Sequence, residues 1–157
     1  MPIAYTILHA PDVLLVSYQG VVTNEEFLTG YKAAYADPFY KPGMHEISDM
    51  RYMDVFDIDM VAIQDLVTWI ADRDELAGAT IRVGILQRSE LHEGLARLYA
   101  AVSDIYKKET VQLFRDLPDI LAWLPVEAAH AGRIASALDA LYRVEAVSAG
   151  HSGSVPR

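Results

Sequence analysis

The stretch HEISDMRYMD, residues 45–54, lies at the centre of the pattern that decides the fold. The turn residues Lys41-Pro42-Gly43 precede it, and His45–Asp49 then predicts a short strand. We expect this strand to end at Ser48-Asp49, and the residues from Met50 onward to form the mouth of the next loop. The stretch would thus place a charged loop directly after a buried strand.

The residues before this stretch predict a hairpin followed by a helix. Residues 4–9 and 13–19 are rich in β-branched and aromatic residues, which favours two short strands. The sequence Ala10-Pro11-Asp12 between them has turn chemistry. Thr23 and Glu26 have the spacing of a capping box, in which each side chain binds the other residue's backbone amide. The helix that begins there is expected to end at Asp37-Pro38.

The residues after this stretch predict three helices separated by two strands. The expected strands cover residues 81–86 and 111–114. The expected helix caps are acidic or hydroxyl side chains, namely Asp57 or Asp59, Ser89 and Asp116. Gly78 is expected to end the first of these helices, and Pro125 follows the last.

The order β-β-α-β-α-β-α-β-α predicts an α/β fold with a single mixed, mostly parallel sheet of about five strands. The first strand comes from a hairpin and should run antiparallel to its neighbour. We therefore expect one α/β domain over residues 1–125. Residues 126–148 predict an appended helix that packs on its own domain or on a second subunit, and residues 149–157 predict a mobile tail.

Composition limits the possible functions. The 157 residues are 52% hydrophobic, which is high for a small domain and suggests a pocket or a subunit interface. The net charge is -9, and it lies in residues 1–75, because residues 76–157 hold nine acidic and nine basic residues. An acidic surface repels phosphate backbones, so we expect no nucleic acid partner. The chain has no cysteine, no signal peptide and no apolar run of membrane-spanning length, which predicts a cytoplasmic location.

Several motifs in order resemble the SpoIIAA-like, STAS-related family of small bacterial proteins. Thr23-x-x-Glu26-Phe27 is followed by Asp37-Pro38-x-x-Lys41-Pro42-Gly43 and by a strand ending Ser48-Asp49-Met50-Arg51. Near the far end, Val111-x-Leu113-Phe114-Arg115-Asp116-Leu117 precedes Ala122-Trp123-Leu124. The resemblance covers about residues 3–124. It implies a STAS-like fold, which is also related to the lipid-binding lobe of Sec14-type proteins.

The resemblance also implies that one known function is missing. STAS relatives that act as anti-sigma-factor antagonists carry an Asp-Ser pair after the third strand, and that Ser is phosphorylated. Asp49 matches the Asp, but Met50 stands where the Ser should be. Ser48 is expected to point to the other face of the strand, because side chains alternate with a period of two. The phosphorylation switch is therefore not expected here.

Two groups of residues are candidates for binding. Asp49, Arg51, Tyr52 and Asp54 follow a strand end, where ligands and partners meet open α/β sheets. The alternative for Asp49 and Arg51 is a structural ion pair. Tyr31, Tyr35, Tyr52 and Tyr99 could line an amphipathic pocket, because each has an apolar ring and a polar tip, or they could simply belong to the core.

Other chemistries have weaker signals. The carboxylates of Asp54, Asp57 and Asp59 could bind Mg²⁺ or Ca²⁺, but acids before a helix are expected without a metal, and we predict none. No Gly-rich phosphate loop is present, and no cofactor is expected. The five histidines belong to no catalytic motif; they are His9, His45, His92, His130 and His151.

Three functions therefore remain open. The first is a non-enzymatic STAS-like module that binds another protein or assembles as a homodimer. The second is a binder or sensor of a small apolar, lipid-like ligand, for which the apolar and Tyr-rich composition speaks. The third is a hydrolase-type enzyme that would use Asp49, His45 and Arg51, which requires a cleft that brings them together.

Overall fold

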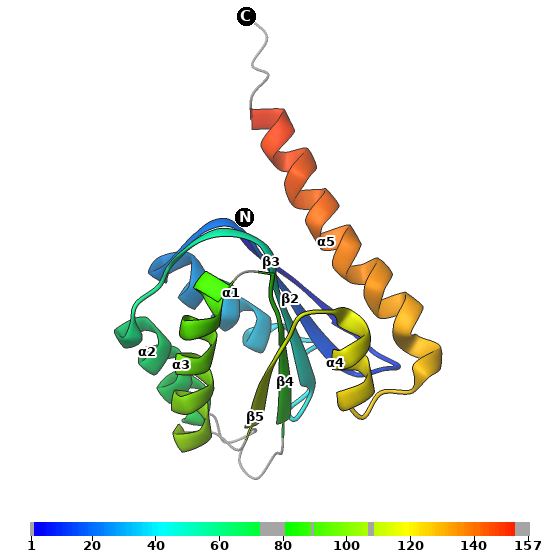
Figure 1. Cartoon of the computed structure of the whole chain (residues 1–157), viewed down its shortest axis with the longest axis horizontal. Coiled ribbons are helices and arrows are strands. Elements are labelled where there is room, and N and C mark those ends of the chain that lie inside the picture. Colours follow the sequence, from blue (N-terminus) through cyan, green and yellow to red (C-terminus); the bar gives the residue numbers. More distant parts are fainter. Residues whose placement is uncertain (1, 73–80, 89, 107–108, 153–157) are drawn as a thin grey trace, which may run out of the picture.

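The protein is a five-stranded α/β sheet with helices on both faces (Figure 1), described from a computed structural model that covers residues 2–72, 81–88, 90–106 and 109–152. The strands are β1 (Ile3–Leu8), β2 (Val13–Thr23), β3 (His45–Asp57), β4 (Ile81–Leu86) and β5 (Glu109–Phe114). The helices are α1 (Asn24–Ala36), α2 (Met60–Ala71), α3 (Glu90–Tyr106), α4 (Leu117–Trp123) and α5 (Ala131–Ser152), with a short 3₁₀ turn at Ala128–His130 before α5.

The strand order explains the layers. The sheet runs β1-β2-β3-β4-β5, with β1 antiparallel to β2 and all other pairs parallel. Each parallel pair is joined by one helix, and crossovers of one hand that step in one direction place their helices on the same face. Helices α1, α2 and α3 therefore lie together on one face, and α4 and α5 lie on the other (Figure 1). This architecture confirms the predicted fold class.

Each face of the sheet carries its own hydrophobic cluster. The larger cluster lies under α1, α2 and α3 and contains fully buried residues such as Phe27, Ile63 and Leu66. The smaller cluster joins the other face to α4 and α5, and Ile134 and Leu138 of α5 are buried in it. The first half of the appended helix thus packs on its own sheet, and the rest projects beyond it (Figure 1).

The predicted end of the third strand was wrong. β3 continues to Asp57, and it pairs with β4 only as far as Asp49, opposite Leu86. From there it pairs with β2 alone, until Thr23 lies opposite Asp57. β2 likewise runs to Thr23 instead of ending at Gln19. Residues 50–57 are therefore not a loop but half of a two-stranded ribbon that extends past the rest of the sheet.

The reason for this error is a pair of β-bulges. The register shifts between Ser17 and Gln19 and again between Gly20 and Val21, and at each shift β3 holds one extra residue. As a result Met50, Met53 and Phe56 all contact the α1–α3 layer at a spacing of three. A spacing of three conceals the period of two by which a strand is recognised.

Most helix ends were predicted correctly. Thr23 and Glu26 form the expected capping box, and Asp116 caps α4. Asp59, and not Asp57, caps α2, because its carboxylate accepts from the amide of Ala62. Gly78 and Ser89, predicted as a helix end and a cap, lie outside the described residues.

Strand and helix bounds differ in places from the prediction. β1 and β5 begin one and two residues earlier than predicted, whereas β4 has the predicted bounds. Of the two helices at the C-terminal end, α5 extends four residues further than the predicted segment, to Ser152. In the described part of the chain, no helix combines the length and the apolar character that crossing a membrane requires.

Candidate functional site

Asp49 and Arg51 form a close ion pair on β3, at the level where β4 ends. Arg51 donates from Nη2 to Asp49 Oδ2 at 2.8 Å, and from Nε to Asp49 Oδ1 at 3.0 Å. The backbone amide of Arg51 also donates to Asp49 Oδ1. The Asp49 side chain is only 1% exposed and that of Arg51 is 32% exposed. The hydrogen bonds that the Arg51 guanidinium makes to Asp49 raise the pKa of Arg51, although burial of the guanidinium acts to lower it.

The ion pair lies beside the helix α5. Tyr52 stacks on Tyr142 of α5, with ring centroids 4.1 Å apart and planes at 19°. The Arg51 guanidinium lies 5.4 Å from the Tyr52 ring, and Asp139 of α5 is close enough to affect the pKa of Arg51. The amide of Gln19 reaches the backbone carbonyl of Leu141. The interpretation as a structural pair therefore has direct support, since these contacts tie β3 and β2 to the helix.

The other tyrosines lie on the opposite face of the sheet. Tyr31 and Tyr35 point from α1 to Glu46, a β3 carboxylate that is 1% exposed. Tyr31 donates to Glu46 Oε1 at 2.7 Å, Ser48 donates to the same oxygen at 2.8 Å, and Tyr18 donates to the Tyr31 hydroxyl at 2.7 Å. Glu46 was not among the predicted site residues; the signal for it was a carboxylate inside a short predicted strand, two positions before Ser48 and hence on the same face.

This network keeps the tyrosines protonated. Burial is the main reason that the pKa values of Tyr18, Tyr31 and Tyr35 lie well above their usual value, and the negative charge of Glu46 adds to it. Buried hydroxyls and a carboxylate that satisfy one another in this way act as a rigid polar unit inside the core.

The cavity beside these tyrosines is too small for a ligand. It is lined by Tyr18, Tyr31, Met50, Tyr99 and further apolar side chains, and its volume is about 10 Å³. A cavity of that size holds at most about one water molecule. The described geometry therefore gives no room for an acyl chain between Tyr31 and Tyr99.

The candidate binding residues thus separate into two groups. Arg51 and Tyr52 lie with Asp49 on the α5 side, whereas Tyr31, Tyr35 and Tyr99 belong to the core on the α1–α3 side. Asp54 is exposed on the ribbon and lies near His92 of α3, where it opposes the lowering of the His92 pKa by burial and by Arg88. No single pocket unites the seven predicted residues.

The residues proposed for a hydrolase are not brought together either. His45 is four residues before Asp49 on the same strand, which separates their Cα atoms by about 13 Å. His45 Nδ1 accepts from the backbone amide of Arg82, and the Asp49 carboxylate is held by Arg51. Across the ranges that the structure describes, no three His, Cys, Asp or Glu side chains are grouped so that they could hold a metal ion.

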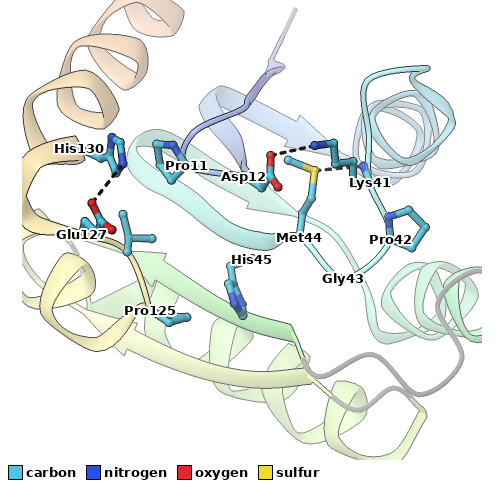
Figure 2. Close-up of a pocket in the computed structure, with 11 residues that line it drawn as sticks. Pro11, Asp12, Lys41, Pro42, Gly43, Met44, His45, Pro125, Glu127 and His130 are labelled. Atoms are coloured by element: carbon cyan, nitrogen blue, oxygen red, sulfur yellow. Dashed lines mark hydrogen bonds and ion pairs between the residues drawn. The ribbon is translucent and has the colours of Figure 1, made fainter.

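A cavity of about 460 Å³ opens at the amino ends of β2 and β3 (Figure 2). Its walls come from the β1–β2 turn, the turn before β3, and the connection between α4 and α5. The lining residues with polar side chains are Asp12, Lys41, His45, Glu127 and His130. This cavity is not predictable from the sequence, because its walls are far apart in the chain.

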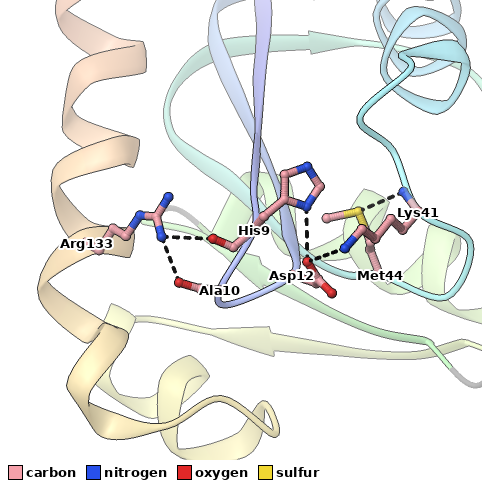
Figure 3. Close-up of polar contacts among 6 residues, drawn as sticks. All are labelled: His9, Ala10, Asp12, Lys41, Met44 and Arg133. Carbon is pink, nitrogen blue, oxygen red and sulfur yellow. Dashed lines mark hydrogen bonds and ion pairs between the residues drawn. The ribbon is translucent and has the colours of Figure 1, made fainter.

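Polar contacts fix the walls of this cavity (Figure 3). Arg133 of α5 donates to the carbonyl oxygens of His9 and Ala10 at 2.9 and 2.7 Å, which holds the helix to the β1–β2 turn. Asp12 contacts both His9 and Lys41, and the Lys41 amide donates to the sulfur of Met44. The cavity is therefore bounded by segments that are tied to one another.

Comparisons with known proteins identify a fold neighbour and nothing more. The sequence matches no protein family and no curated protein. Among solved structures, the chain is similar to an uncharacterized protein from the DUF3478 family with a SpoIIAA-like fold, from Shewanella loihica PV-4. The two are 20% identical, the match covers 78% of this chain and 91% of the other, and the TM-score is 0.49.

Proposed function

We propose that this protein is a non-enzymatic, STAS-like interaction module that assembles as a homodimer through the face that carries α5. The observation that supports this most is an exposed apolar pair on the β2–β3 ribbon. Val21 and Val55 lie opposite each other in the register and are 51% and 48% exposed. Aliphatic side chains paired across two strands in this way are usually covered.

This pair faces the same side as α5. The next residues along the ribbon, Val22 and Phe56, pack into the cluster under α1–α3, so alternation turns Val21 and Val55 to the other face. The half-exposed ring of Tyr142 lies on that face too, stacked on Tyr52. Together Val21, Val55, Tyr52 and Tyr142 form what we term the ribbon patch.

The C-terminal half of α5 favours a second copy as the partner. The helix has 22 residues, and its last turns project beyond the sheet (Figure 1). A helical segment on its own is marginally stable in water, so packing of the projecting turns against another molecule would stabilise them. Charge does not oppose packing along α5, because residues 131–152 hold two acidic and two basic residues.

Sedimentation velocity over a range of protein concentrations tests this proposal. We expect a species of twice the chain mass of 17.4 kDa. Val21→Lys and Val55→Lys place a charge in the ribbon patch and should each weaken the dimer at least about tenfold. Val61→Lys is the matched control, because Val61 is exposed on α2, which lies on the other face of the sheet. A native protein that stays monomeric at the highest concentration, or a dimer that both patch variants leave intact, would contradict the proposal.

The two other functions have less support. A lipid-like ligand would need a cavity larger than the one between Tyr31 and Tyr99. A hydrolase would need a nucleophile and a base within hydrogen-bonding reach, and His45 and Asp49 are not so placed.

A further inference from the structure

We infer that the cavity at the amino ends of β2 and β3 binds a small zwitterion, a molecule with one ammonium and one carboxylate group. This site is distinct from the ribbon patch. It lies at the opposite end of the strands, and neither depends on the other. Its volume of about 460 Å³ falls in the range of about 300–1,000 Å³ that is typical of small-molecule sites.

The charges of the cavity are separated across it. Lys41 lies on the wall formed by the turn before β3, and Glu127 lies on the wall formed by the α4–α5 connection, with His45 between them (Figure 2). Each wall also has a companion group: Asp12 is 3.4 Å from Lys41 Nζ, and His130 Nε2 is 4.0 Å from Glu127. The lining thus carries both signs of charge, with Lys41 beside Asp12 in one part and Glu127 beside His130 in the other.

His45 adds a hydrogen-bond donor to the cavity. The backbone amide of Arg82 can only donate, so His45 Nδ1 must accept, and the neutral ring then carries its proton on Nε2. Burial and the charge of Arg82 lower the pKa of His45, which keeps the ring neutral near pH 7. Nε2 makes no hydrogen bond to another residue that the structure describes. Its N–H can donate to a ligand carboxylate, beside the ammonium of Lys41.

The remaining lining gives the ligand an apolar surface. Pro11, Pro42, Pro125, Met44 and Val126 form it together with Gly43. The prolines have few conformations to lose, and the walls are already tied together by Arg133 and by the pair of Asp12 and Lys41. A preformed site loses little conformational entropy when a ligand binds.

The cavity is lined by both positively and negatively charged side chains, and this combination favours one class of ligand. An anion without an ammonium group would meet Lys41 and His45 but also the carboxylates of Asp12 and Glu127. A simple amine would meet those carboxylates but also Lys41. Only a ligand with both groups pairs with both walls, and each contact is weak because the side chains of Lys41 and Glu127 are largely exposed. We therefore expect dissociation constants in the range of about 0.1–10 mM.

Nuclear magnetic resonance of the full chain, labelled at the histidine rings, tests the inference. The probes are glycine, β-alanine, 4-aminobutyrate and 6-aminohexanoate, which vary the distance between the two charges. Butyrate and butylamine carry one charge each and are titrated at equal ionic strength. We expect at least one amino acid to shift the ring signals of His45 saturably, and to bind at least about tenfold more tightly than both single-charge probes. The ring nitrogen shifts should also identify the Nε2–H form of His45.

Matched variants locate the binding. Lys41→Gln and Glu127→Gln should each weaken the best probe at least about fivefold. Lys32→Gln and Glu25→Gln, on α1, remove the same charges elsewhere and should change its affinity less than twofold. The inference is overturned if no amino acid shifts His45, if butyrate or butylamine binds within tenfold of the best amino acid, or if the cavity variants behave as the controls do. None of these results bears on the dimer, which is measured by sedimentation.

Discussion

Arg51 holds the buried carboxylate of Asp49 with two guanidinium hydrogen bonds, although the two residues are separated by a single position on the same strand. Residues two apart on a strand share a face, and both side chains reach the α5 side of β3 although the first β-bulge lies between Asp49 and Tyr52. It closes the α5 side of β3 at the place where β4 ends, and it is followed directly by the stack of Tyr52 on Tyr142.

Replacing Arg51 should destabilise the fold. Arg51→Met leaves Asp49 buried without its cation, and a broken buried pair costs about 3–5 kcal/mol. Because Arg51 is one-third exposed, we expect about 2–3 kcal/mol, measured by urea unfolding and circular dichroism. Arg97→Met removes an exposed partner of Glu93 and should cost less than about 0.5 kcal/mol. Equal losses in the two variants would mean that the Asp49 pair has no special weight.

The stack of Tyr52 on Tyr142 should fasten α5 to the sheet. Tyr142→Ala is expected to cost about 1–2 kcal/mol through lost stacking and burial, whereas Tyr142→Phe keeps the ring and should cost little. Hydrogen exchange should accelerate over residues 134–142 in the alanine variant alone. If exchange in that segment is the same in all three proteins, the stack does not hold the helix.

Two glycines should respond to alanine with opposite signs. A Cβ on Gly84 would lie 2.9 Å from Cγ2 of Ile120, which is fully buried between β4 and α4. Gly84→Ala should therefore cost about 1–3 kcal/mol. A Cβ on Gly94 of α3 would meet nothing within 4 Å, so Gly94→Ala should stabilise by about 0.5–1 kcal/mol. Thermal unfolding of both variants measures the two effects, and Gly84→Ala combined with Ile120→Leu, which lacks the Cγ2 methyl group, should recover part of the loss.

Stability should fall steeply in alkaline solution. Burial raises the pKa values of Tyr18, Tyr31 and Tyr35 above those of the unfolded chain, so only the unfolded state loses these protons just above pH 10. The contribution of the three protonated tyrosines to the free energy of unfolding is complete below pH 10. It is lost as the pH rises above 10, by up to about 1.4 kcal/mol per pH unit for each tyrosine. Urea unfolding between pH 8 and 11 measures this dependence.

The variant Tyr18→Phe tests the origin of the stability loss in alkaline solution. It removes one ionisable group whose hydroxyl donates only to Tyr31, so the decline above pH 10 should become roughly a third shallower. Absorbance at 295 nm follows the ionisation directly. Three tyrosines that ionise near pH 10 while the protein is still folded would contradict the buried network.

The sequence by itself determined the architecture and most element ends. Local patterns carry this information: the hairpin turn before Val13, the capping box of Thr23 and Glu26, and the buried run of β4 depend on residues that are close together in the chain. The ion pair of Asp49 and Arg51 was foreseen for the same reason, as one of two interpretations of an i, i+2 spacing.

Only the tertiary structure decided where the functional surfaces lie. Two extra residues in β3 changed its apolar spacing, so the ribbon that carries Val55 could not be recognised from a period of two. Side chains alternate along β3, so Glu46 points to the tyrosines and Asp49 points to the α5 side, which places the two groups of candidate residues on opposite faces of the sheet. The cavity of His45, Lys41 and Glu127 joins segments up to 119 residues apart, from Pro11 to His130, and only the crossover connections of the sheet bring those segments together.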